Sequence, residues 1–431
     1  MTGIVRPDRN ETPARRGQVV NWVPLLAIVL LLLSFAIQPV QAQTFTVLYD
    51  FTNGTDGGIP APTLIRDQAG NLYGTTSQGG GINYSNCNPP QGCGNVFKID
   101  PRGQETVLYD FKDSPDGASP KAGLIRDAAG NLYGTALLGG TSNSGAIFKV
   151  DKSGKETVLY SFTGGRDGGF PLASVILGAA GNLYGTTKIG GDLSCQVGQM
   201  TGCGVVFKLA KTGKLTVLHR FHGSDGADPF AGLVRDKSGN LYGTTSAGGT
   251  GCYDGCGTAF KLDKTGKLTV LHVFTDGTDG AVPGWGALIQ DAAGNLYGTT
   301  QWGGDLSCNN NGAGCGTVFK LDKAGKETVL HNFTSGTDGG LPSGALVRDG
   351  AGNLYGTTSA GGDLRCNGGG DCGTVFKLDK TGKETVLHCF EDNSDGTFPE
   401  AGLVRDASGN LYGTTSWDGH VNFGAVFKLT P

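Results

Sequence analysis

The stretch AGNLYGTT at residues 351–358 decides the fold of this 431-residue chain, because close copies of it recur along the sequence. The tyrosine of each G-N-L-Y-G copy falls at one of seven positions, namely Tyr73, Tyr133, Tyr184, Tyr242, Tyr297, Tyr355 and Tyr412. Their mean spacing is about 56 residues. A period of this length indicates an architecture in which one supersecondary unit is repeated and stacked.

Three further phrases repeat with the same period, typified by GLVRD at 402–406, TVFKL at 317–321 and TVLHNF at 328–333. Each unit therefore offers four runs of five to seven residues that are rich in Val, Ile, Thr, Tyr and Phe and are separated by turn residues. This pattern predicts four β-strands per unit. We name them A (GLVRD type), B (NLYGTT type), C (TVFKL type) and D (TVLHNF type). No helical period appears after residue 42.

Seven four-stranded antiparallel units predict an all-β fold, a seven-bladed β-propeller. A β-solenoid fits less well, since its repeats are usually shorter. Residues Phe45–Phe51 form a D strand, whereas the last unit, 401–429, ends on a C strand. We therefore expect the N-terminal strand to join the last blade and close the ring. Leu and Tyr of N-L-Y-G should face opposite neighbouring blades, and the following Gly should leave room for a large side chain from the adjacent sheet.

The unit AGLVRDASGNLYGTTS at 401–416, followed by GAVFKL at 424–429, resembles the GloVer tandem repeat and, more loosely, NHL-type propeller repeats. The resemblance covers residues 44–430. GloVer repeats occur in exported proteins whose tails carry one of several anchoring signals, so the resemblance implies an exported repeat domain but no particular activity. This chain departs from the anchored pattern, because it stops at Pro431 directly after a strand.

The first 42 residues have the three-part layout of a secretory signal peptide. Four arginines precede the apolar run VVNWVPLLAIVLLLLSFAI at 19–37, and Val40 and Ala42 are the small residues of a cleavage site. We expect cleavage after Ala42, a secreted or periplasmic propeller domain over residues 43–431, and no membrane association after cleavage. An uncleaved membrane anchor is the alternative.

Cleavage would remove four arginines and two acidic residues, which takes the chain from 34 basic and 38 acidic residues to 30 and 36, a net charge of −6. No basic block remains, and binding to nucleic acid requires one. We therefore expect no nucleic-acid partner.

The alternation of strand direction places the A–B and C–D turns on one face of the propeller and the B–C and D–A loops on the other. The turn face is uniform, whereas the loop face varies, and binding residues concentrate in variable loops on a rigid scaffold. The second residue after each G-T-T or G-T-A varies most, and it is Gln78, Leu138, Ile189, Ala247, Trp302, Ala360 or Trp417. The ligand-binding candidates are Trp302, Trp417, Leu138 and Ile189, with Phe170, Phe230 and Phe398 beside the D–A prolines. The competing interpretation is that these side chains cover the ends of the blades.

Ten of the eleven cysteines fall in B–C loops as pairs: Cys87/Cys93, Cys195/Cys203, Cys252/Cys256, Cys308/Cys315 and Cys366/Cys372. Their spacing varies and no His accompanies them, which disfavours zinc. Export favours disulfides instead, with Cys389 left as a thiol. The D-G-x-x-P phrases of the D–A loops, with Asn53, Asp113, Asp276 and Asp392 upstream, suggest turns rather than calcium sites. No cofactor or metal is expected.

Catalytic signals are weak. His219, His272, His331 and His388 occupy the position of Tyr49, Tyr109 and Tyr160 in other repeats, which favours a structural role. The residues that break the repeat and could supply acid–base chemistry are His222, Asp228, Asp254, Glu391, Glu400 and His420.

The function expected from the sequence is therefore a monomeric, non-catalytic binding module for an extracellular glycan or protein. A propeller hydrolase or lyase acting on glycans is one alternative, and a surface-structural repeat protein is another. Carboxylates gathered at the mouth of the ring would favour the enzyme, whereas an aromatic rim would favour binding.

Overall fold

The computed structural model describes residues 2–3, 43–81, 87, 92–250, 255–308, 312–362, 372–391, 395–417 and 422–431. The chain divides into two units, Met1–Ala42 and Gln43–Pro431. The expected signal peptide therefore lies almost entirely outside the described residues. Among the residues that are described, no helix has the length and apolar character needed to span a bilayer.

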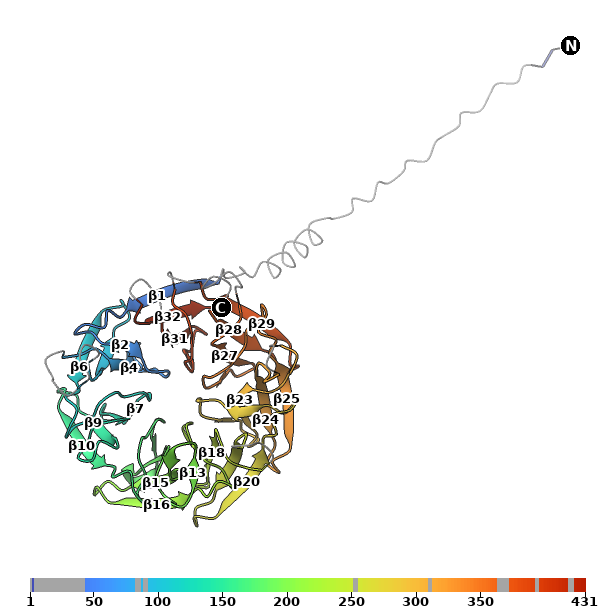
Figure 1. The fold of residues 1–431 in the computed structure, drawn as a ribbon. Coiled ribbons are helices and arrows are strands. Elements are labelled where there is room, and N and C mark those ends of the chain that lie inside the picture. Colours follow the sequence, from blue (N-terminus) through green and yellow to red (C-terminus); the bar gives the residue numbers. More distant parts are fainter. Residues whose placement is uncertain are drawn as a thin grey trace. The chain divides into compact units, whose positions relative to one another are not determined.

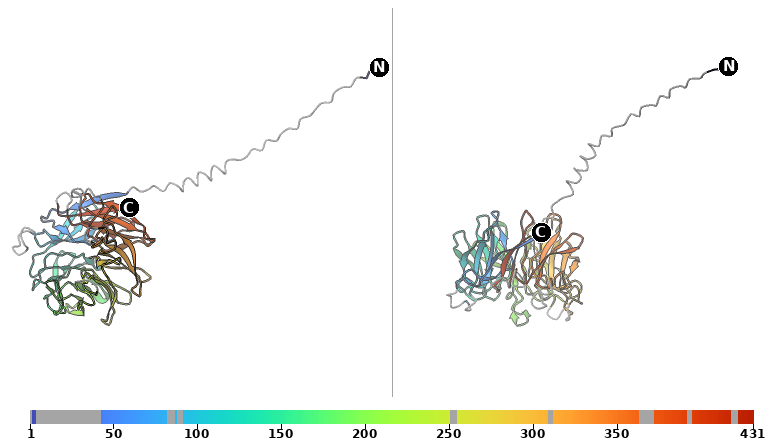
Figure 2. Two further views of the ribbon diagram at one scale, coloured as in Figure 1. Left: turned by 45° about the vertical axis from the view of Figure 1, so that its right-hand side comes forward. Right: turned by 90° about the horizontal axis from the view of Figure 1, so that it is seen from above.

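The unit Gln43–Pro431 is a seven-bladed β-propeller, as predicted, with its sheets arranged in a ring (Figure 1). Figure 2 shows the ring from two further directions. The strands of each blade follow the order A-B-C-D, and the A strands lie nearest the axis while the D strands form the outer rim, as β7 and β10 show.

The strands of the seven blades have the following bounds. Blade I contains β2 (Gly58–Pro60), β3 (Ile65–Arg66), β4 (Leu72–Gln78), β5 (Asn95–Ile99) and β6 (Glu105–Asp110). Blade II contains β7 (Ile125–Arg126), β8 (Leu132–Ala136), β9 (Ala146–Val150) and β10 (Glu156–Ser161). Blade III contains β11 (Ile176–Leu177), β12 (Leu183–Thr187), β15 (Val205–Leu209) and β16 (Leu215–Arg220), with a hairpin of β13 (Gln196–Val197) and β14 (Met200–Thr201) in its B–C loop. Blade IV contains β17 (Val234–Arg235), β18 (Leu241–Thr245), β19 (Thr258–Leu262) and β20 (Leu268–Val273).

The remaining three blades complete the ring. Blade V contains β21 (Ala281–Pro283), β22 (Ile289–Gln290), β23 (Leu296–Trp302), β24 (Thr317–Leu321) and β25 (Glu327–Asn332). Blade VI contains β26 (Val347–Arg348), β27 (Leu354–Thr358), β28 (Thr374–Leu378) and β29 (Glu384–Cys389). Blade VII contains β30 (Val404–Arg405), β31 (Leu411–Thr415) and β32 (Ala425–Thr430), and its D strand is β1 (Thr44–Asp50).

The N-terminal strand closes the ring, which confirms the prediction. β1 pairs with β32 in antiparallel register from Thr44↔Thr430 to Asp50↔Ala425. Phe51, which follows β1, is fully buried. Phe45 stacks against Phe427 with 5.4 Å between the ring centroids. The junction between β1 and β32, which we call the seam, therefore combines a full strand ladder with a buried aromatic contact.

The A strands are shorter than predicted, because only two residues of each GLVRD phrase pair with the B strand. The residue before each D–A proline has a left-handed backbone, with φ between 51° and 53°; these residues are Ile59, Ser119, Phe170, Asp228, Val282, Leu341 and Phe398. A left-handed residue turns the chain out of an extended strand, and the proline that follows has no N–H to donate. In blades I and V this residue lies inside a short strand, β2 or β21, that pairs with the B strand ahead of the GLVRD-type strand.

Each blade junction has its own apolar cluster, built from the Leu of one N-L-Y-G copy and the Tyr of the preceding copy. In the first, Leu72 is only 2% exposed and packs in one cluster with Tyr412 of blade VII. The same pairing recurs at Leu132/Tyr73, Leu183/Tyr133, Leu241/Tyr184, Leu296/Tyr242, Leu354/Tyr297 and Leu411/Tyr355. Burying one leucine contributes about 1.5–3 kcal/mol. One blade alone has no neighbour to provide that burial.

The Asp and Asn of each repeat fix the position of the tyrosine side chain through hydrogen bonds. The Asp67 carboxylate accepts hydrogen bonds from Asn71 N (2.9 Å), Asn71 Nδ2 (2.9 Å) and Tyr73 Oη (3.0 Å). Arg126 of the next blade lies over the Tyr73 ring, with Cζ 5.7 Å from its centroid. The same carboxylate–Asn–Tyr set recurs at Asp127, Asp236, Asp291, Asp349 and Asp406. In blade III a glycine, Gly178, stands in place of this Asp, and the 3-10 turn η1 (Ala179–Gly181) follows it.

The glycine that follows the tyrosine has a different partner from the one predicted. A Cβ added at Gly74 would lie 2.5 Å from Phe97 Cζ and 2.9 Å from Leu64 Cδ2. Phe97 is the cross-strand neighbour of Gly74 in the same sheet. The expectation that the side chain comes from the adjacent sheet is therefore wrong, because the C-strand Phe folds back over its own blade.

The outer rim of the ring carries a second set of junction contacts. A D-strand Tyr or His in each blade faces the Asp of the following D-G turn; Tyr160 Oη donates to Asp167 at 2.9 Å and His388 Nε2 lies 2.7 Å from Asp395 Oδ2. These bonds support the expectation that Tyr and His are interchangeable as structural groups. The D strand of the next blade begins beside this Tyr or His. In four blades its first residue is a glutamate, at positions 105, 156, 327 and 384.

These four glutamates predict a pH-dependent stability. Burial raises the pKa of Glu105, Glu156, Glu327 and Glu384 from 4.5 to about 7. Between pH 4.5 and about 7 the folded protein keeps protons on these glutamates that the unfolded chain has released. Their contribution to the free energy of unfolding is therefore largest below pH 4.5 and is lost as the pH rises to about 7. We expect Glu156→Gln to raise the melting temperature at about pH 8 by a few degrees and to leave it unchanged near pH 4.5.

Calorimetry of the wild type and Glu156→Gln at the two pH values measures this difference. Glu391→Gln is the matched control, because Glu391 is exposed, and this variant should follow the wild type at both pH values. A Glu156→Gln protein with the same melting temperature as the wild type at the higher pH would contradict the prediction.

Candidate ligand-binding site

A cavity of about 560 Å³ opens at the centre of the loop face. Its lining comes from blades I, II, V and VII, at Gln78, Lys121, Leu138, Trp285, Glu400, Ser416 and Trp417, among others. Blades VII, I and II are neighbours in the ring (Figure 1), whereas Trp285 comes from blade V, which is not adjacent to any of them, so the cavity extends toward the axis. Each of these residues belongs to a D–A or B–C loop or to the end of a B strand. The cavity thus lies on the face that the sequence indicated.

Two exposed tryptophans dominate the apolar part of the lining. Trp417 is 52% exposed and Trp285 is 43% exposed. The backbone of Trp417 is fixed because Thr397 N donates to its carbonyl oxygen at 2.8 Å. Leu138, 36% exposed, adds an aliphatic surface in blade II. An indole that is held by its backbone and exposed on one side offers rigid contact area to a ligand.

Trp285 is held by its neighbours across two blades. Its ring stacks on Phe230 with 5.4 Å between centroids and 19° between planes. Lys188 Nζ in turn lies 4.8 Å from the centroid of the Phe230 ring. The result is a row of side chains from blades III, IV and V that ends in the cavity.

Trp285 is missing from the sequence-based candidates, although a signal for it exists. In blade V, Asp279 of the D-G phrase and Asp291 of the following A–B turn are 12 positions apart in the sequence. In the other six repeats the equivalent spacing is eleven. The extra residue falls in the segment Gly284–Gly286, and an insertion in an otherwise constant loop indicates a special role.

Glu400 is one of two acidic residues in the lining, the other being Asp113. Burial raises the pKa of Glu400, while a hydrogen bond from Ser416 and the charge of Lys121 oppose the rise. Ser416 Oγ lies 3.5 Å from Glu400 Oε2. Lys121 is exposed and comes from blade II. The cavity therefore combines aromatic faces with a carboxyl group, a hydroxyl group and an ammonium group.

The sequence-based candidates divide into two groups. Leu138 and Trp417 line the cavity, and Phe230 supports Trp285. Trp302 is half-buried and packs against the apolar cluster around Phe319 and Leu296. The other three candidates, Ile189, Phe170 and Phe398, are half-buried in the loops, where Ile189 pairs with Gly169.

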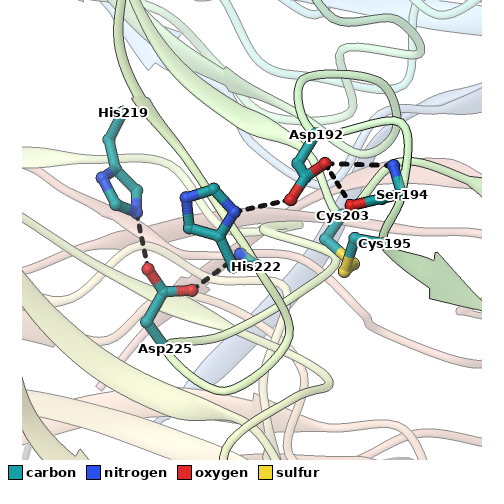
Figure 3. A network of polar contacts seen from close by, with 7 residues as sticks. All are labelled: Asp192, Ser194, Cys195, Cys203, His219, His222 and Asp225. Carbon is teal, nitrogen blue, oxygen red and sulfur yellow. Dashed lines mark hydrogen bonds and ion pairs between the residues drawn. A yellow bond between two sulfur atoms is a disulfide. The ribbon is translucent and has the colours of Figure 1, made fainter.

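The candidate acid–base residue His222 belongs to a loop clamp that follows the D strand β16, shown in Figure 3. His222 Nδ1 lies 2.7 Å from Asp192 Oδ2, and Ser194 Oγ donates to Asp192 Oδ1 at 2.7 Å. The hydrogen bonds from Ser194 and His222 lower the pKa of Asp192 to about 2. The backbone N of His222 also donates to Asp225, which faces His219. This arrangement ties the B–C loop of blade III to the D–A loop that follows.

Of the other repeat-breaking residues, Asp228, Glu391 and Glu400 belong to the described part of the chain. Burial raises the pKa of Asp228 to about 6, opposed by Lys188. Glu391 is exposed and its backbone N donates to Asp395. Asp254 and His420 lie outside the described residues. Of the six residues, Glu400 is the one that lines the central cavity within the described part of the chain.

Disulfides close the B–C loops, as expected from the cysteine pairs. The structure contains Cys87–Cys93, Cys195–Cys203 and Cys308–Cys315. Cys256 and Cys372 are also disulfide-bonded, while Cys252 and Cys366, their expected partners, lie outside the described residues. Cys389 keeps its thiol, half-buried at the end of β29. Such bonds indicate an oxidising environment, extracellular or periplasmic.

The Asp of each D-G-x-x-P phrase acts as a turn cap. Asp56 accepts hydrogen bonds from Thr52 N at 2.8 Å and from Gly54 N at 3.2 Å. Asn53, Asp113 and Asp276 have φ values of 57°, 71° and 62°, which is the left-handed turn geometry, and Asp392 lies outside the described residues. These contacts match the turn interpretation of the phrase.

The family model of the Gloeobacter/Verrucomicrobia repeat matches the chain over residues 34–197, 85–312 and 286–431. A comparison with curated proteins found no match.

Among solved structures, virginiamycin B lyase from Staphylococcus aureus has a TM-score of 0.55 at 12% identity, covering 90% of this chain and 99% of that one. A gluconolactonase from Xanthomonas campestris has a TM-score of 0.44 at 14% identity and covers 90% of each chain. At these identities the likeness extends to the propeller fold alone.

Proposed function

The chain belongs to the Gloeobacter/Verrucomicrobia repeat family, and from that premise we propose that it is an exported binding module which takes a carbohydrate into the cavity at the centre of its loop face. The observation that carries the proposal is the pair of exposed indoles, Trp285 and Trp417, in one concave site. Sugar rings present flat patches of C–H groups, which an exposed indole face can cover.

The size of the cavity supports a small ligand. A volume of about 560 Å³ falls within the range of roughly 300–1,000 Å³ that is usual for small-molecule sites. A protein partner would instead need a broad surface, of about 800 Å² per side. A short oligosaccharide, or the end of a longer glycan, fits this concave shape better than the surface of a folded protein.

The polar groups supply what a sugar needs besides an apolar face. Hydroxyl groups both donate and accept hydrogen bonds, and Gln78, Ser416 and Glu400 offer both kinds of partner in the same cavity. Lys121 adds a positive charge that favours glycans with carboxylate or sulfate groups. The disulfides support export, since bonds of this kind persist in oxidising compartments.

Substitution of the tryptophans tests the proposal. We expect Trp417→Ala and Trp285→Ala each to weaken binding of a responding oligosaccharide at least tenfold, or about 1.4 kcal/mol, because each removes an exposed aromatic face. Neither should change the melting temperature by more than a degree or two. The responding glycan is first found on a glycan array and its affinity is then measured by titration calorimetry.

Two further variants control this experiment. Leu306→Ala removes an exposed apolar side chain, 41% exposed, that does not line the cavity, and it should bind like the wild type. Trp302→Ala should lower the melting temperature by several degrees, because Trp302 packs against the core. Unchanged affinity in both cavity variants would refute the proposal.

A second candidate function, glycan cleavage, rests on Glu400 and on Asp113, which lines the same cavity. Glycoside hydrolysis uses two carboxyl groups, one of which must stay protonated, and burial, which raises the pKa of Glu400, favours its protonated form. Incubation of the bound glycan with the wild type and with Glu400→Gln distinguishes the two functions. Release of shorter sugars by the wild type but not by Glu400→Gln would favour the enzyme, and an intact glycan favours the binding module.

A further inference from the structure

The outer junctions between blades differ in their side chains, although their backbones repeat. Each combines the D-strand Tyr or His of one blade, the Asp of its D-G turn, and a residue at the start of the next D strand. In order around the ring the pairs are Tyr49/Glu105, Tyr109/Glu156, Tyr160/Leu215, His219/Leu268, His272/Glu327, His331/Glu384 and His388/Phe45. In the described part of the chain, a His, an Asp and a Glu come together at two of these junctions, between blades IV and V and between blades V and VI.

The junction between blades IV and V has the geometry of a metal site. His272 Nε2 lies 3.2 Å from Asp279 Oδ2 and 3.9 Å from Glu327 Oε2. The three ligand atoms are all within 4.8 Å of one another. Ligand atoms around a tetrahedral zinc ion are about 3.3 Å apart, given metal–ligand distances of about 2.0–2.1 Å. A shift of roughly an ångström or less in each side chain would complete the triangle.

The three side chains are mostly shielded from solvent. Exposure is 19% for His272, 17% for Asp279 and 11% for Glu327. Thr275 Oγ1 donates to the other oxygen of Asp279 at 2.6 Å, which fixes the orientation of that carboxylate. The ligands of metal sites are usually oriented by hydrogen bonds of this kind from neighbouring residues.

The junction between blades V and VI carries the same three residue types in a looser arrangement, since its ligand atoms do not all lie within 4.8 Å of one another. His331 Nε2 lies 3.6 Å from Asp338 Oδ2, beyond hydrogen-bonding distance. That nitrogen and Glu384 Oε1 are both buried and have no hydrogen-bond partner among the described residues. Thr334 N donates to Asp338 at 3.0 Å, in the same way that Thr275 N bonds to Asp279. A buried imidazole nitrogen that makes no hydrogen bond is available to a metal ion.

The electrostatics of both junctions favour a cation. At the junction between blades IV and V, the Asp279 and Glu327 carboxylates lie beside the same imidazole and are largely shielded from solvent, so their negative charges repel each other. A divalent cation would offset this repulsion. The junctions of Tyr49 and Tyr109 carry the same Asp–Glu pair, but there a phenol donates its proton to the Asp, as Tyr49 Oη does at 3.1 Å. A neutral imidazole has one nitrogen without a proton, and the lone pair of that nitrogen can bind a metal ion.

We propose that His272, Asp279 and Glu327 form one binding site for Zn²⁺, and that His331, Asp338 and Glu384 form a second. One nitrogen and two carboxylate oxygens suit zinc, with the fourth position left to water, whereas calcium prefers oxygen ligands alone. Each ion would link two neighbouring blades at the outer rim. This proposal departs from the sequence-based expectation that the chain binds no metal.

The repeat itself supplies the variants that test the proposal. His272→Tyr and His331→Tyr install the residue that three other blades use, so the bond to the Asp is kept and the fold is preserved. We expect the chelator-treated protein, equilibrated with micromolar Zn²⁺ and desalted, to retain two more equivalents of zinc than the double variant His272→Tyr/His331→Tyr. Each single variant should lose one. Elemental analysis measures the metal, and the melting temperature of each sample is followed in parallel.

Two controls distinguish a built site from adventitious binding. Glu105→Gln/Glu156→Gln changes the same glutamate position at the tyrosine junctions and should retain zinc like the wild type, whereas Glu327→Gln/Glu384→Gln should lose two equivalents. Zn²⁺ should raise the melting temperature of the wild type but not that of the His→Tyr double variant, and Ca²⁺ should raise neither. Equal zinc content in the wild type and the His→Tyr double variant would overturn the proposal.

Discussion

Deletion of residues 43–52 is expected to cost the propeller most of its stability, since it removes the D strand of blade VII. The deletion breaks the ladder from Thr44↔Thr430 to Asp50↔Ala425 and removes Phe45 and Phe51. Removing one buried Phe side chain alone costs about 3–5 kcal/mol, and whole domains are stable by only about 5–15 kcal/mol. The shortened protein should lose its cooperative thermal transition or melt at least ten or so degrees lower.

The exposed edge of β32 provides a second readout. An unpaired strand edge is prone to pair with other chains, so the shortened protein should aggregate at concentrations at which the full chain is monodisperse. A synthetic peptide of residues 43–52 should partly restore the melting temperature by refilling the edge. Thr46→Ala, on an exposed position of β1, serves as control and should shift stability by less than about 0.5 kcal/mol. A shortened protein that melts like the full chain would show that the seam contributes little.

Gly356→Ala is expected to have the next largest effect, about 1–3 kcal/mol of destabilisation. A Cβ at this position would lie 2.7 Å from Phe376 Cζ and 2.9 Å from Leu346 Cδ2, both in the buried part of blade VI. Neither group can move away without displacing its neighbours, because the interior is close-packed. Chemical denaturation measures the loss.

Nearby residues provide the matched controls for this variant. Gly350 has nothing within 4 Å of its added Cβ, so Gly350→Ala should be neutral or slightly stabilising. Phe376→Leu in the Gly356→Ala background should cost less than Phe376→Leu alone, because the smaller side chain relieves the clash. Additive effects of the two substitutions would argue against a direct contact between the added methyl group and the ring.

The blade architecture could be predicted from the sequence because each repeated phrase carries both its strand and its turn. Asp406, Asn410 and Tyr412 form one hydrogen-bonded set within seven residues, so local spacing reveals it. The closing strand could be inferred for a similar reason, since Phe45–Phe51 matches the D phrase. In each case the relevant information lies within a single repeat.

Features that depend on backbone strain or on distant pairs could not be predicted in this way. Ile59 and Val282 have φ values of 52° and 51°, which β-branched residues rarely adopt, so residue propensity argues against a left-handed backbone before the D–A prolines. His272 and Glu327 are 55 residues apart and meet only because two blades stand side by side. Trp285 of blade V reaches a cavity that is otherwise lined by blades VII, I and II, which are not its neighbours in the ring.

The seam between β1 and β32 also sets the order in which the propeller can be completed. β1 is the first strand of the domain to be synthesised and its partner is the last, so this ladder has the longest sequence separation of any in the fold. Contacts of long sequence separation form slowly, because the entropy of closing a long loop must be overcome first. Six complete blades can therefore assemble while β1 is still unpaired, and the growing chain carries an open strand edge until residues 425–430 arrive. The ring is then held shut by the contact that formed last, and thermal opening should begin there.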